Sequence, residues 1–504
     1  MQGILVGGLE AFFGFQQILL TSIGVFMGII IGVLPGIGPL LGVILATPIA
    51  LYVTPVAGMG LLIGIFVGGS CGGAISAILL RIPGTPLAAA TLLDGYPMAQ
   101  KGKSREAVGL AISASSLGGF LGGIALVFVS PLLAKIALKF GPPEFFALMV
   151  TGLIAIAVVA RESTVKGLLS ACLGLAVASM GTDPFTGYDR FTFGYGNLMG
   201  GINLVAILVG LFAVSEMFIQ IQQGGLDIKP NINIFRAPLA SAIHVLKDTV
   251  NLIRSSAIGT FIGALPGTGG VIAGFISYAM AKSYSRKPER FGSGTPEGVI
   301  ASEAANNACC GGVLIPSLAL AIPGDAISAV LLGALLLIGL LPGPELFNEH
   351  PNVVGGIFFA YIAANIILFL LGILFTPLFV GIIKIRKNRL IPIIILLSIV
   401  GTYSVQTSVF DIWCMLIFGL IGYGMRKAGF PLPPLVIARV LGPLLESAFR
   451  RTLIISNGSF SIFFTRPIAL TILIFNGLLL VWTSIPPEKL RLAKETIVRR
   501  LFKS

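Results

Sequence analysis

Long apolar stretches separated by short polar connections make up most of this chain. A helix needs about 20 apolar residues to span a bilayer, and stretches near or above that length recur along the whole sequence. Uninterrupted ones cover residues 15–34, 56–80, 106–134, 143–160, 163–180, 201–222, 353–383, 390–404, 409–425 and 467–483. Gly and Pro interrupt three more, at 37–53, 252–281 and 299–341. The pattern predicts an all-α polytopic membrane protein with about 12 transmembrane segments and several broken or re-entrant helices.

The interruptions occur as two similar pairs. Gly32 to Pro39 reads GVLPGIGP and recurs, roughly 230 to 240 residues later, as GALPGTGG at Gly263 to Gly270. Cys-Gly-Gly followed by Ile-Pro-Gly occurs at 71–84 and again at 310–324. Pro lacks a backbone donor and Gly permits tight turns, so a membrane helix breaks at each motif. Broken backbone at membrane depth is buried in protein or lines a polar cavity, so the duplicated breaks predict a substrate site between two repeats.

The same order of long and short spans follows each pair of breaks. We therefore expect a first transmembrane repeat at 1–222, a cytoplasmic linker at 223–250, a second repeat at 251–485 and a basic tail at 486–504. Equivalent connections differ in charge. The connection at 99–105 has three basic residues, whereas its counterpart at 342–352 has two acidic residues and neither Lys nor Arg. Since basic loops stay in the cytoplasm, the repeats are predicted to be inverted.

The basic tail at 486–504 does not fit a strictly inverted second repeat, which would leave it outside the cell. An additional crossing would return the tail to the cytoplasmic face. The segment 430–465 is long enough to supply one, and we expect that it does.

Composition excludes several classes of function. The chain has 56% hydrophobic and 11% charged residues, and the basic residues behind its net charge of +13 lie in short loops. Membrane topology explains that charge better than nucleic-acid binding does. The first 30 residues contain no Lys or Arg, so no cleaved signal peptide is expected. The five cysteines lie in apolar segments without metal-type spacing and are expected to serve packing: Cys71, Cys172, Cys309, Cys310 and Cys414.

No enzymatic machinery is recognisable in the sequence. Gly102-Lys103-Ser104 resembles the end of a phosphate-binding loop, but Pro97 occupies the position of the required first glycine. Neither a metal-binding helix motif nor a nucleophile elbow is present. We therefore expect a protein that is not an enzyme, uses no cofactor, has no metal site beyond a coupling cation and is driven by an ion gradient.

Each helix break offers chemistry suited to ions. Backbone N–H groups at a helix N-terminus attract carboxylates, and freed carbonyls with side-chain oxygens suit Na⁺. A single Gly in a membrane helix more often serves close packing, but the duplicated Pro-Gly motifs favour a site. The expected substrate-binding residues are Pro35, Gly36, Gly38, Gly72, Gly73, Pro83, Gly84, Thr85, Pro266, Gly267, Thr268, Gly269, Pro323 and Gly324. The expected cation-binding residues are Ser70, Asn306, Asn307 and Asp325.

Three carboxylates and one basic residue near the breaks have two open interpretations each. Asp325 and Glu303 either couple a cation or cap a helix, because an intramembrane carboxylate is costly and needs a reason. Asp94 is either functional or a helix cap at the interface. Arg81 either pairs with the anionic substrate or extends its side chain to the membrane surface.

These motifs together resemble the large membrane subunit of the tripartite tricarboxylate transporters. The resemblance rests on Gly32 to Pro39, Gly68 to Gly73, Ile82 to Pro86 with Asp94 to Pro97, Gly263 to Gly270, and Glu303 to Asn307 with Ile322 to Asp325. It implies a multi-pass importer of di- or tricarboxylates, usually Na⁺-driven, in a bacterial inner membrane. It also implies a small membrane subunit and a periplasmic solute-binding protein as partners. The alternative is a channel or another anion permease that acts without a receptor, although no rings of like charge indicate a channel.

Overall fold

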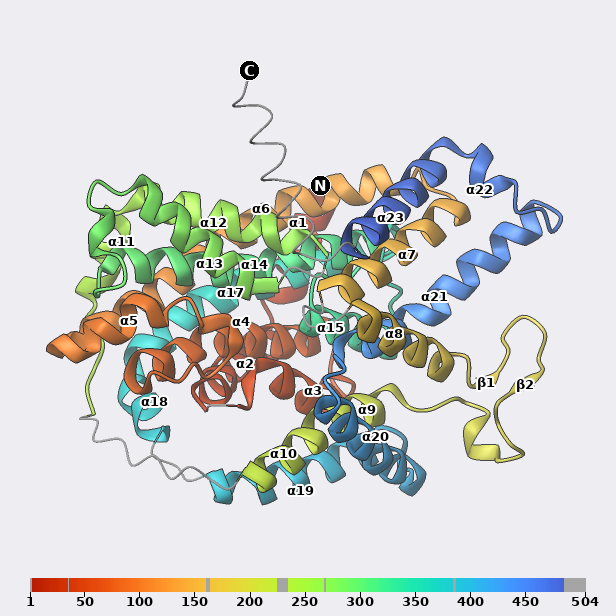
Figure 1. Cartoon of the computed structure of the whole chain (residues 1–504), viewed down its shortest axis with the longest axis horizontal. Helices are drawn as coiled ribbons and strands as arrows, with labels where there is room; N and C mark the ends of the chain where they lie inside the picture. The colour runs from red at the N-terminus through yellow and green to blue at the C-terminus, as the bar shows by residue number, and fades with distance from the viewer. Residues whose placement is uncertain are drawn as a thin grey trace, which may run out of the picture.

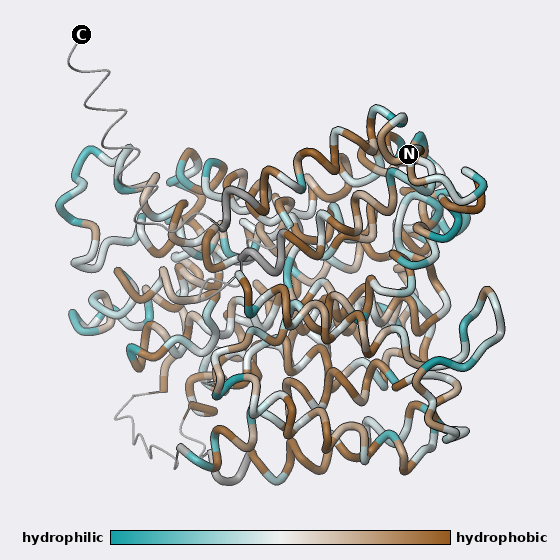
Figure 2. Tube along the Cα trace, turned by 45° about the vertical axis from the view of Figure 1, so that its right-hand side comes forward, coloured by the Kyte–Doolittle hydropathy of each residue, from teal (hydrophilic) through white to brown (hydrophobic). Residues whose placement is uncertain are grey.

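A computed structural model describes residues 2–34, 36–159, 164–223, 234–266, 269–383 and 387–484. Over these residues the chain is mostly helical, with one short antiparallel ribbon that pairs β1 (Gly181–Thr182) with β2 (Asp189–Arg190). Apolar residues cover the helices, and hydrophilic residues concentrate at helix ends and connections (Figure 2). Six of the described helices are long and apolar enough to cross a membrane: Phe15–Val33, Pro55–Leu80, Leu92–Ala137, Leu204–Gln222, Pro351–Leu374 and Val409–Lys427. The predicted class, an all-α multi-pass membrane protein, is thus confirmed, while the number of crossings stays a prediction.

In the described residues of the first half, eight α-helices precede the β-ribbon and a last span follows it. The helices before the ribbon are α1 (Gln2–Phe12), α2 (Phe15–Val33), α3 (Gly38–Ala50), α4 (Pro55–Leu80), α5 (Leu92–Met98), α6 (Ser104–Ala137), α7 (Pro142–Val159) and α8 (Thr164–Ala178). A 3-10 turn, η1 (Pro86–Ala88), precedes α5, and a π-helical turn, η2 (Ala99–Lys103), follows it. After the ribbon come η3 (Gly196–Leu198) and one span formed by α9 (Leu204–Leu208), η4 (Val209–Val214) and α10 (Ser215–Gln223).

The second half has a similar series of helices. It begins with α11 (Ala240–Lys247), α12 (Thr249–Ala264), α13 (Gly269–Tyr284), η5 (Pro288–Arg290), α14 (Pro296–Leu320) and α15 (Ala326–Leu337). It continues with α16 (Pro344–Glu349), α17 (Pro351–Leu374), α18 (Thr376–Ile382), α19 (Lys387–Gln406) and α20 (Val409–Lys427). The last helices are α21 (Pro433–Ile455), α22 (Ile462–Thr465) and α23 (Pro467–Ser484).

The first break of each half is the tip of a helical hairpin. Helix α3 folds back along α2, so that a side chain at Gly42 would start 2.8 Å from Ile31. The hairpin then packs on α4 through small residues, as membrane helices commonly do. A side chain at Gly28 of α2 would start 2.6 Å from the Ile65 carbonyl oxygen. The equivalent hairpin of α12 and α13 packs on α14 in the same way.

Helices α6 and α14 run side by side in the same direction. Gly118 of α6 lies against Ala304 of α14, and Gly122 lies one turn further along, against Ala308. Helices α4 and α17 also run parallel, since Gly60 lies against Ala360 and Val56 lies against Gly356.

Helix α17 runs in the opposite direction to α6. Gly119 lies against Asn365, whereas Gly123, further along α6, lies against Tyr361, which comes earlier in α17. Helix α4 runs parallel to α17, and α14 runs parallel to α6. Helices α4 and α14 are therefore antiparallel. They meet near their middles, where Asn306 Nδ2 donates to the Ser70 carbonyl oxygen at 3.2 Å.

Basic connections from both halves gather at one end of the helix group formed by α4, α6, α14 and α17. Lys101 Nζ donates to the Ser293 carbonyl oxygen at 2.6 Å, and Arg105 Nε donates to the Arg236 carbonyl oxygen at 3.3 Å. Helices α5 and α11 lie at this end, at the left of Figure 1, whereas the β-ribbon lies at the far right. Of the predicted linker, residues 224–233 lie outside the described residues, as does all of the tail at 486–504.

The remaining helices lie beside this group in two further groups. One contains α7, α8, α21, α22 and α23, and the other contains α9, α10, α19 and α20 (Figure 1). The segment 430–465, which was expected to add a crossing, forms α21 and α22. Helix α21 packs closely on α8, where Gly174 lies against Leu435 and Gly442 lies against Ala178. Whether α21 crosses the membrane stays a prediction.

Candidate functional site

The two hairpin tips begin with the same backbone geometry. Helix α2 ends at Leu34 (φ −82°, ψ 114°), and α12 ends at Leu265 (φ −86°, ψ 119°). At the first tip, Gly36 has φ +87° and Gly38 has φ +69°, which are conformations that favour glycine. Pro266 is the last residue described before the second tip. The predicted site residues Pro35, Gly267 and Thr268 lie outside the described residues, and Gly269 begins α13.

The second break of each half ends a long helix with a left-handed residue. Helix α4 ends at Arg81 (φ 60°, ψ 21°), and α14 ends at Ala321 (φ 57°, ψ 26°). The chain then returns to the hairpin tip. Gly84 N donates to the Gly73 carbonyl oxygen at 3.2 Å, and a side chain at Gly324 would start 2.9 Å from the Gly263 carbonyl oxygen. Pro83 and Pro323 lie within these returning loops.

Packing corrects the register in which the two halves match. A side chain at Gly72 on α4 would start 2.5 Å from the Ile29 carbonyl oxygen. A side chain at Gly312 on α14 would likewise start 2.3 Å from the Thr260 carbonyl oxygen. Gly72 therefore corresponds to Gly312. Alignment of the two Cys-Gly-Gly motifs instead pairs Gly72 with Gly311, which differs by one residue. Contact with the hairpin, rather than letter identity, defines equivalent positions.

A cavity of about 430 Å³ lies where the breaks of both halves meet. Its lining residues come from both hairpins, both returning loops and the α9–α10 and α20 spans: Gly36 to Leu41, Thr85 to Leu87, Phe212, Glu216, Gly270, Val271, Asp325 to Ile327, Arg426 and Pro433. Four residues of the predicted site, Gly36, Gly38, Thr85 and Asp325, thus line one cavity. The buried Thr85 hydroxyl has no hydrogen-bond partner among the described residues.

Asp325 caps the helix that follows the second break. Its Oδ1 accepts from Ser328 N at 2.7 Å, and its own N–H donates to Ser328 Oγ at 2.9 Å. This reciprocal capping box places the partly buried carboxylate at the N-terminus of α15, on the cavity wall. Of the two interpretations of Asp325, the helix cap is present, and cation binding stays a prediction.

Three of the predicted cation-binding residues lie at the crossing of α4 and α14. Ser70, Asn306 and Asn307 are fully buried. The Asn306 Nδ2 to Ser70 hydrogen bond joins two of them, whereas Asn306 Oδ1 and both amide atoms of Asn307 have no partner among the described residues. A buried polar atom without a partner costs about 1–3 kcal/mol. These atoms suit a ligand that supplies the missing interactions.

Asp94 and Arg81, each with two open interpretations, form contacts outside the cavity. Asp94 Oδ1 accepts from three backbone N–H groups of the α13–α14 connection, at Gly292, Gly294 and Thr295, over 2.7–2.9 Å. Asp94 therefore holds that connection in place. The guanidinium of Arg81 lies 5.6 Å from the centre of the Tyr96 ring, its side chain is exposed, and it is not part of the cavity wall.

Glu216 and Arg426 are site residues that sequence reasoning did not include. Arg426 Nη1 pairs with Glu216 Oε2, and both residues line the cavity. Arg426 lies in the last turn of α20, where sequence alone predicts a loop charge. Glu216 is the one charged residue of the span Leu204–Gln222, and the cost of an intramembrane carboxylate could have marked it.

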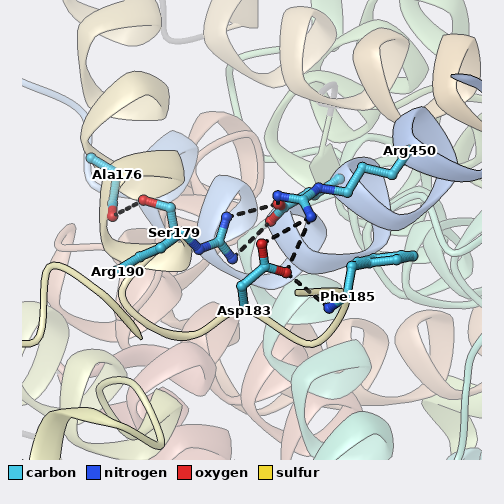
Figure 3. A network of polar contacts seen from close by, with 7 residues as sticks. Ala176, Ser179, Asp183, Phe185, Arg190 and Arg450 are labelled. Carbon is cyan, nitrogen blue, oxygen red and sulfur yellow. Dashed lines mark hydrogen bonds and ion pairs between the residues drawn. The ribbon is translucent and has the colours of Figure 1, made fainter. Parts of the chain in front are cut away.

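A second polar network anchors the β-ribbon to α21 (Figure 3). Arg450 pairs with Asp183 Oδ2 at 2.9 Å and with Glu446 Oε1 at 2.8 Å, and Arg190 pairs with Glu446 at 2.7 Å. The backbone N–H of Phe185 and, more weakly, Arg450 lower the pKa of Asp183 to about 2. The ribbon is thus held by ion pairs that persist at neutral pH.

The fold and cavity define a class of protein: a helical membrane protein whose broken helices enclose a cavity between two similar halves. The family description "Tripartite tricarboxylate transporter TctA family" matches residues 18–437, and the chain belongs to that family. It is therefore a subunit of a tripartite transporter and a multi-pass membrane protein.

Two relatives from Agrobacterium vitis are similar to this chain. The "Uncharacterized 52.8 kDa protein in TAR-I ttuC' 3'region" is 38% identical over 429 residues, which are 84% of this chain and 85% of the relative. The "Uncharacterized protein in TAR-II ttuC' 3'region" is 38% identical over 215 residues, which are 43% of this chain and 89% of the relative. No solved structure matches the chain.

Proposed function

We propose that this chain is the large membrane subunit of a secondary carboxylate importer in a bacterial inner membrane. It works with a small membrane subunit and a periplasmic solute-binding protein, and a cation gradient, of Na⁺ in the first instance, drives uptake. Family membership supports the transporter subunit, and the chemistry of the cavity supports an anionic substrate.

The observation that carries the proposal is the cavity between the broken helices. Helix α3 begins at Gly38, and its N-terminus, which no side chain caps, opens onto the cavity. The N-terminus of α15 also lies on the cavity wall, where Asp325 caps it. Free N–H groups at an uncapped end favour a carboxylate. The volume of about 430 Å³ falls within the usual range of roughly 300–1,000 Å³ for small-molecule sites. Arg426 lines the same cavity, where it pairs with Glu216.

The coupling cation is proposed to bind at the crossing of α4 and α14. Ser70, Asn306 and Asn307 offer hydroxyl, amide and carbonyl oxygens, which are hard ligands that suit Na⁺. Asn306 also faces the second hairpin, since a side chain at Gly270 would start 3.0 Å from Asn306 Oδ1. Gly270 lines the cavity, so cation and substrate would sit on either side of one hairpin.

The two halves are proposed to be inverted repeats. Antiparallel α4 and α14, antiparallel α6 and α17, and the matched backbone angles at Leu34 and Leu265 support this arrangement. Basic connections at one end of these helices support a cytoplasmic location for that end. Inverted halves around a central site are the arrangement expected for alternating access.

The β-ribbon is proposed to contact the solute-binding protein. It lies at the end of the molecule opposite the basic connections (Figure 1), which supports a periplasmic location. Aromatic side chains in the ribbon and directly after it are exposed: Tyr188 by 76%, Phe193 by 76% and Tyr195 by 69%. Aromatic side chains are enriched at protein interfaces, and the ion pairs with α21 hold these ones in position.

Transport by reconstituted vesicles tests the proposal. The chain is reconstituted with its small membrane subunit, and uptake of radiolabelled citrate and of other di- and tricarboxylates is measured with and without the solute-binding protein. We expect accumulation only with an inward cation gradient and the solute-binding protein present. Accumulation with ATP alone would overturn the proposal, and gradient-driven uptake without the solute-binding protein would favour a permease that needs no receptor.

A further inference from the structure

Arg439 of α21 contacts the connection that leads into α9. Its Nη2 donates to the Ile202 carbonyl oxygen at 3.0 Å, whereas its buried Nε has no hydrogen-bond partner among the described residues. Among the same residues no Asp or Glu forms an ion pair with it, although Arg190 and Arg450 both pair with Glu446. A partly buried guanidinium with an unsatisfied N–H is costly, so this one suits an anionic ligand.

Three helices that line the cavity meet beside Arg439. A side chain at Gly333 of α15 would start 2.7 Å from Leu204 Cδ2 of α9 and 3.6 Å from Val440 Cγ2 of α21. Val440 directly follows Arg439. Arg439 therefore lies where α9, α15 and α21 come together.

Each of these helices also leads to the cavity over a similar length. Pro433 of α21, Phe212 of the α9–α10 span and Ile327 of α15 line the cavity. Each lies six to eight residues along its own helix from the place where the three helices meet. At a rise of ~1.5 Å per residue, Arg439 lies roughly 10 Å from the cavity along the helix axes.

The β-ribbon lies on the other side of Arg439. The connection that contains Ile202 pairs with β1, since Thr182 N donates to the Met199 carbonyl oxygen at 2.8 Å. Further along α21 from the cavity, Arg450 pairs with Asp183 and holds the ribbon (Figure 3). Arg439 thus lies between the ribbon and the cavity.

We propose that Arg439 binds one carboxylate group of the substrate on its way between the β-ribbon and the cavity. The inference rests on the transport function proposed above and adds a second binding site to it. The side chain is partly exposed, so an anion can reach the guanidinium, whose fork of N–H groups matches a carboxylate.

The surroundings of Arg439 explain why a charge is needed there. The neighbouring side chains of Leu204, Val440 and Ile202 are apolar, and an anion that passes them loses hydration without gaining hydrogen bonds. A fixed positive charge midway offsets that loss. A single guanidinium that already donates to Ile202 binds the anion weakly enough to release it to the cavity.

Nuclear magnetic resonance of the guanidinium tests binding without transport. The purified complex is labelled with ¹⁵N-arginine in phosphatidylcholine nanodiscs, and the Nε–H signal that disappears in Arg439→Lys is assigned to Arg439. Should that variant fail to fold, Arg439→Gln gives the same assignment. We expect citrate to shift this signal saturably, and chloride at equal ionic strength to leave it in place. A signal that citrate does not move overturns the proposal, as does an equal shift with chloride, which would show an adventitious ion only.

A second set of nanodiscs separates the substrate from lipid headgroups, which are also anionic. Phosphatidylglycerol replaces part of the phosphatidylcholine, and the citrate titration is repeated. We expect the same citrate-dependent shift in both sets. A signal that phosphatidylglycerol moves, and that citrate then leaves unchanged, assigns Arg439 to a lipid headgroup and overturns the proposal.

Uptake kinetics in vesicles test the role of Arg439 in transport. Arg439→Gln removes the charge, so we expect KM for citrate to rise roughly tenfold, which corresponds to about 1.4 kcal/mol, with kcat unchanged. Arg439→Lys keeps the charge and should lie between this variant and wild type. Arg451→Gln, at an exposed arginine of the same helix, is the matched control.

Two kinetic outcomes would contradict the proposal. A KM for Arg439→Gln equal to that of Arg451→Gln overturns it. A lower kcat at unchanged KM overturns it as well, because that result indicates that Arg439 only holds the Ile202 connection in place. If the wild-type complex transports no carboxylate at all, the proposed function fails, and the citrate titration still decides whether Arg439 binds a carboxylate.

Discussion

Cys310 Sγ lies 3.4 Å from Ser70 Oγ, and the two residues occupy equivalent positions on α4 and α14. The equivalence follows from the register that pairs Gly72 with Gly312. A residue can contact its own symmetry-related counterpart only if the twofold axis passes between the two residues. If the halves are inverted repeats, the axis therefore passes between Ser70 and Cys310, beside the amide of Asn306. The proposed cation site would lie on it.

Inverted halves predict opposite faces for the connections at 99–105 and 342–352. With Cys172 replaced by Ala, a cysteine introduced at Lys103 should react with a membrane-impermeant thiol reagent from the cytoplasmic side. A cysteine introduced at Asn348 should react only from the periplasmic side. Both positions are exposed. Labelling of both from the same side would contradict the inverted arrangement.

A side chain at the first hairpin tip should strongly lower transport. Gly36 has φ +87°, and an added Cβ would lie 3.1 Å from Gln220 Nε2. The left-handed conformation alone costs a side chain about 1–2 kcal/mol. We expect Gly36→Val to lower uptake at least roughly tenfold, in line with a cost above 1.4 kcal/mol at the site. Gly424→Ala on α20, where an added Cβ meets nothing within 4 Å, should transport normally.

Removal of the positive charge of Arg426 from the cavity wall should weaken substrate binding. Arg426→Gln leaves the Glu216 carboxylate uncompensated beside an anionic substrate. The uncompensated carboxylate repels the substrate, so we expect KM for the carboxylate to rise at least roughly tenfold, which corresponds to about 1.4 kcal/mol. The neighbouring Lys427→Gln, whose ammonium lies over the Tyr423 ring, is the matched control. Equal KM values for the two variants would show that Arg426 does not contribute to the site.

The aromatic ribbon should control the response to the solute-binding protein. Tyr188→Ala and Phe193→Ala should reduce receptor-dependent uptake severalfold while the abundance of the subunit stays constant, because both side chains are exposed. Ala substitution at exposed Leu239, at the opposite end, is the control. Receptor-dependent uptake that is unchanged in both ribbon variants would place the receptor elsewhere.

Anchoring of the ribbon should not depend on pH in the physiological range. The pKa of Asp183 falls from 3.8 to about 2 in the folded protein, chiefly because the Phe185 N–H donates to its carboxylate. A lowered pKa contributes stability that is present above 3.8 and is lost as the pH falls toward about 2. Asp183 should therefore remain charged at mildly acidic and neutral pH, and it should cause no difference in affinity for the solute-binding protein between the two conditions. A change that disappears in Asp183→Asn would contradict this.

The local properties of the chain were predictable from sequence because each depends on a few adjacent residues. Apolar length predicts membrane helices, and Pro and Gly end helices wherever they occur, so the breaks near Gly36, Gly84 and Gly324 lie where the motifs indicated. Loop charge predicts a cytoplasmic location for the connection at 99–105, and that location stays a prediction. The family resemblance, which rested on those motifs, is confirmed.

Contacts between residues far apart in the sequence were decided by tertiary structure alone. Glu216 and Arg426 meet across more than 200 positions, and nothing in either local sequence names the other. The role of Asp94 depends on three N–H groups of a loop in the other half, and the hydroxyls around Glu303 come from Thr91 and Ser115. Even the match between the halves needed the packing of Gly72 and Gly312. Sequence specifies which groups a helix carries, whereas the partner that satisfies a buried polar group depends on which helices pack together.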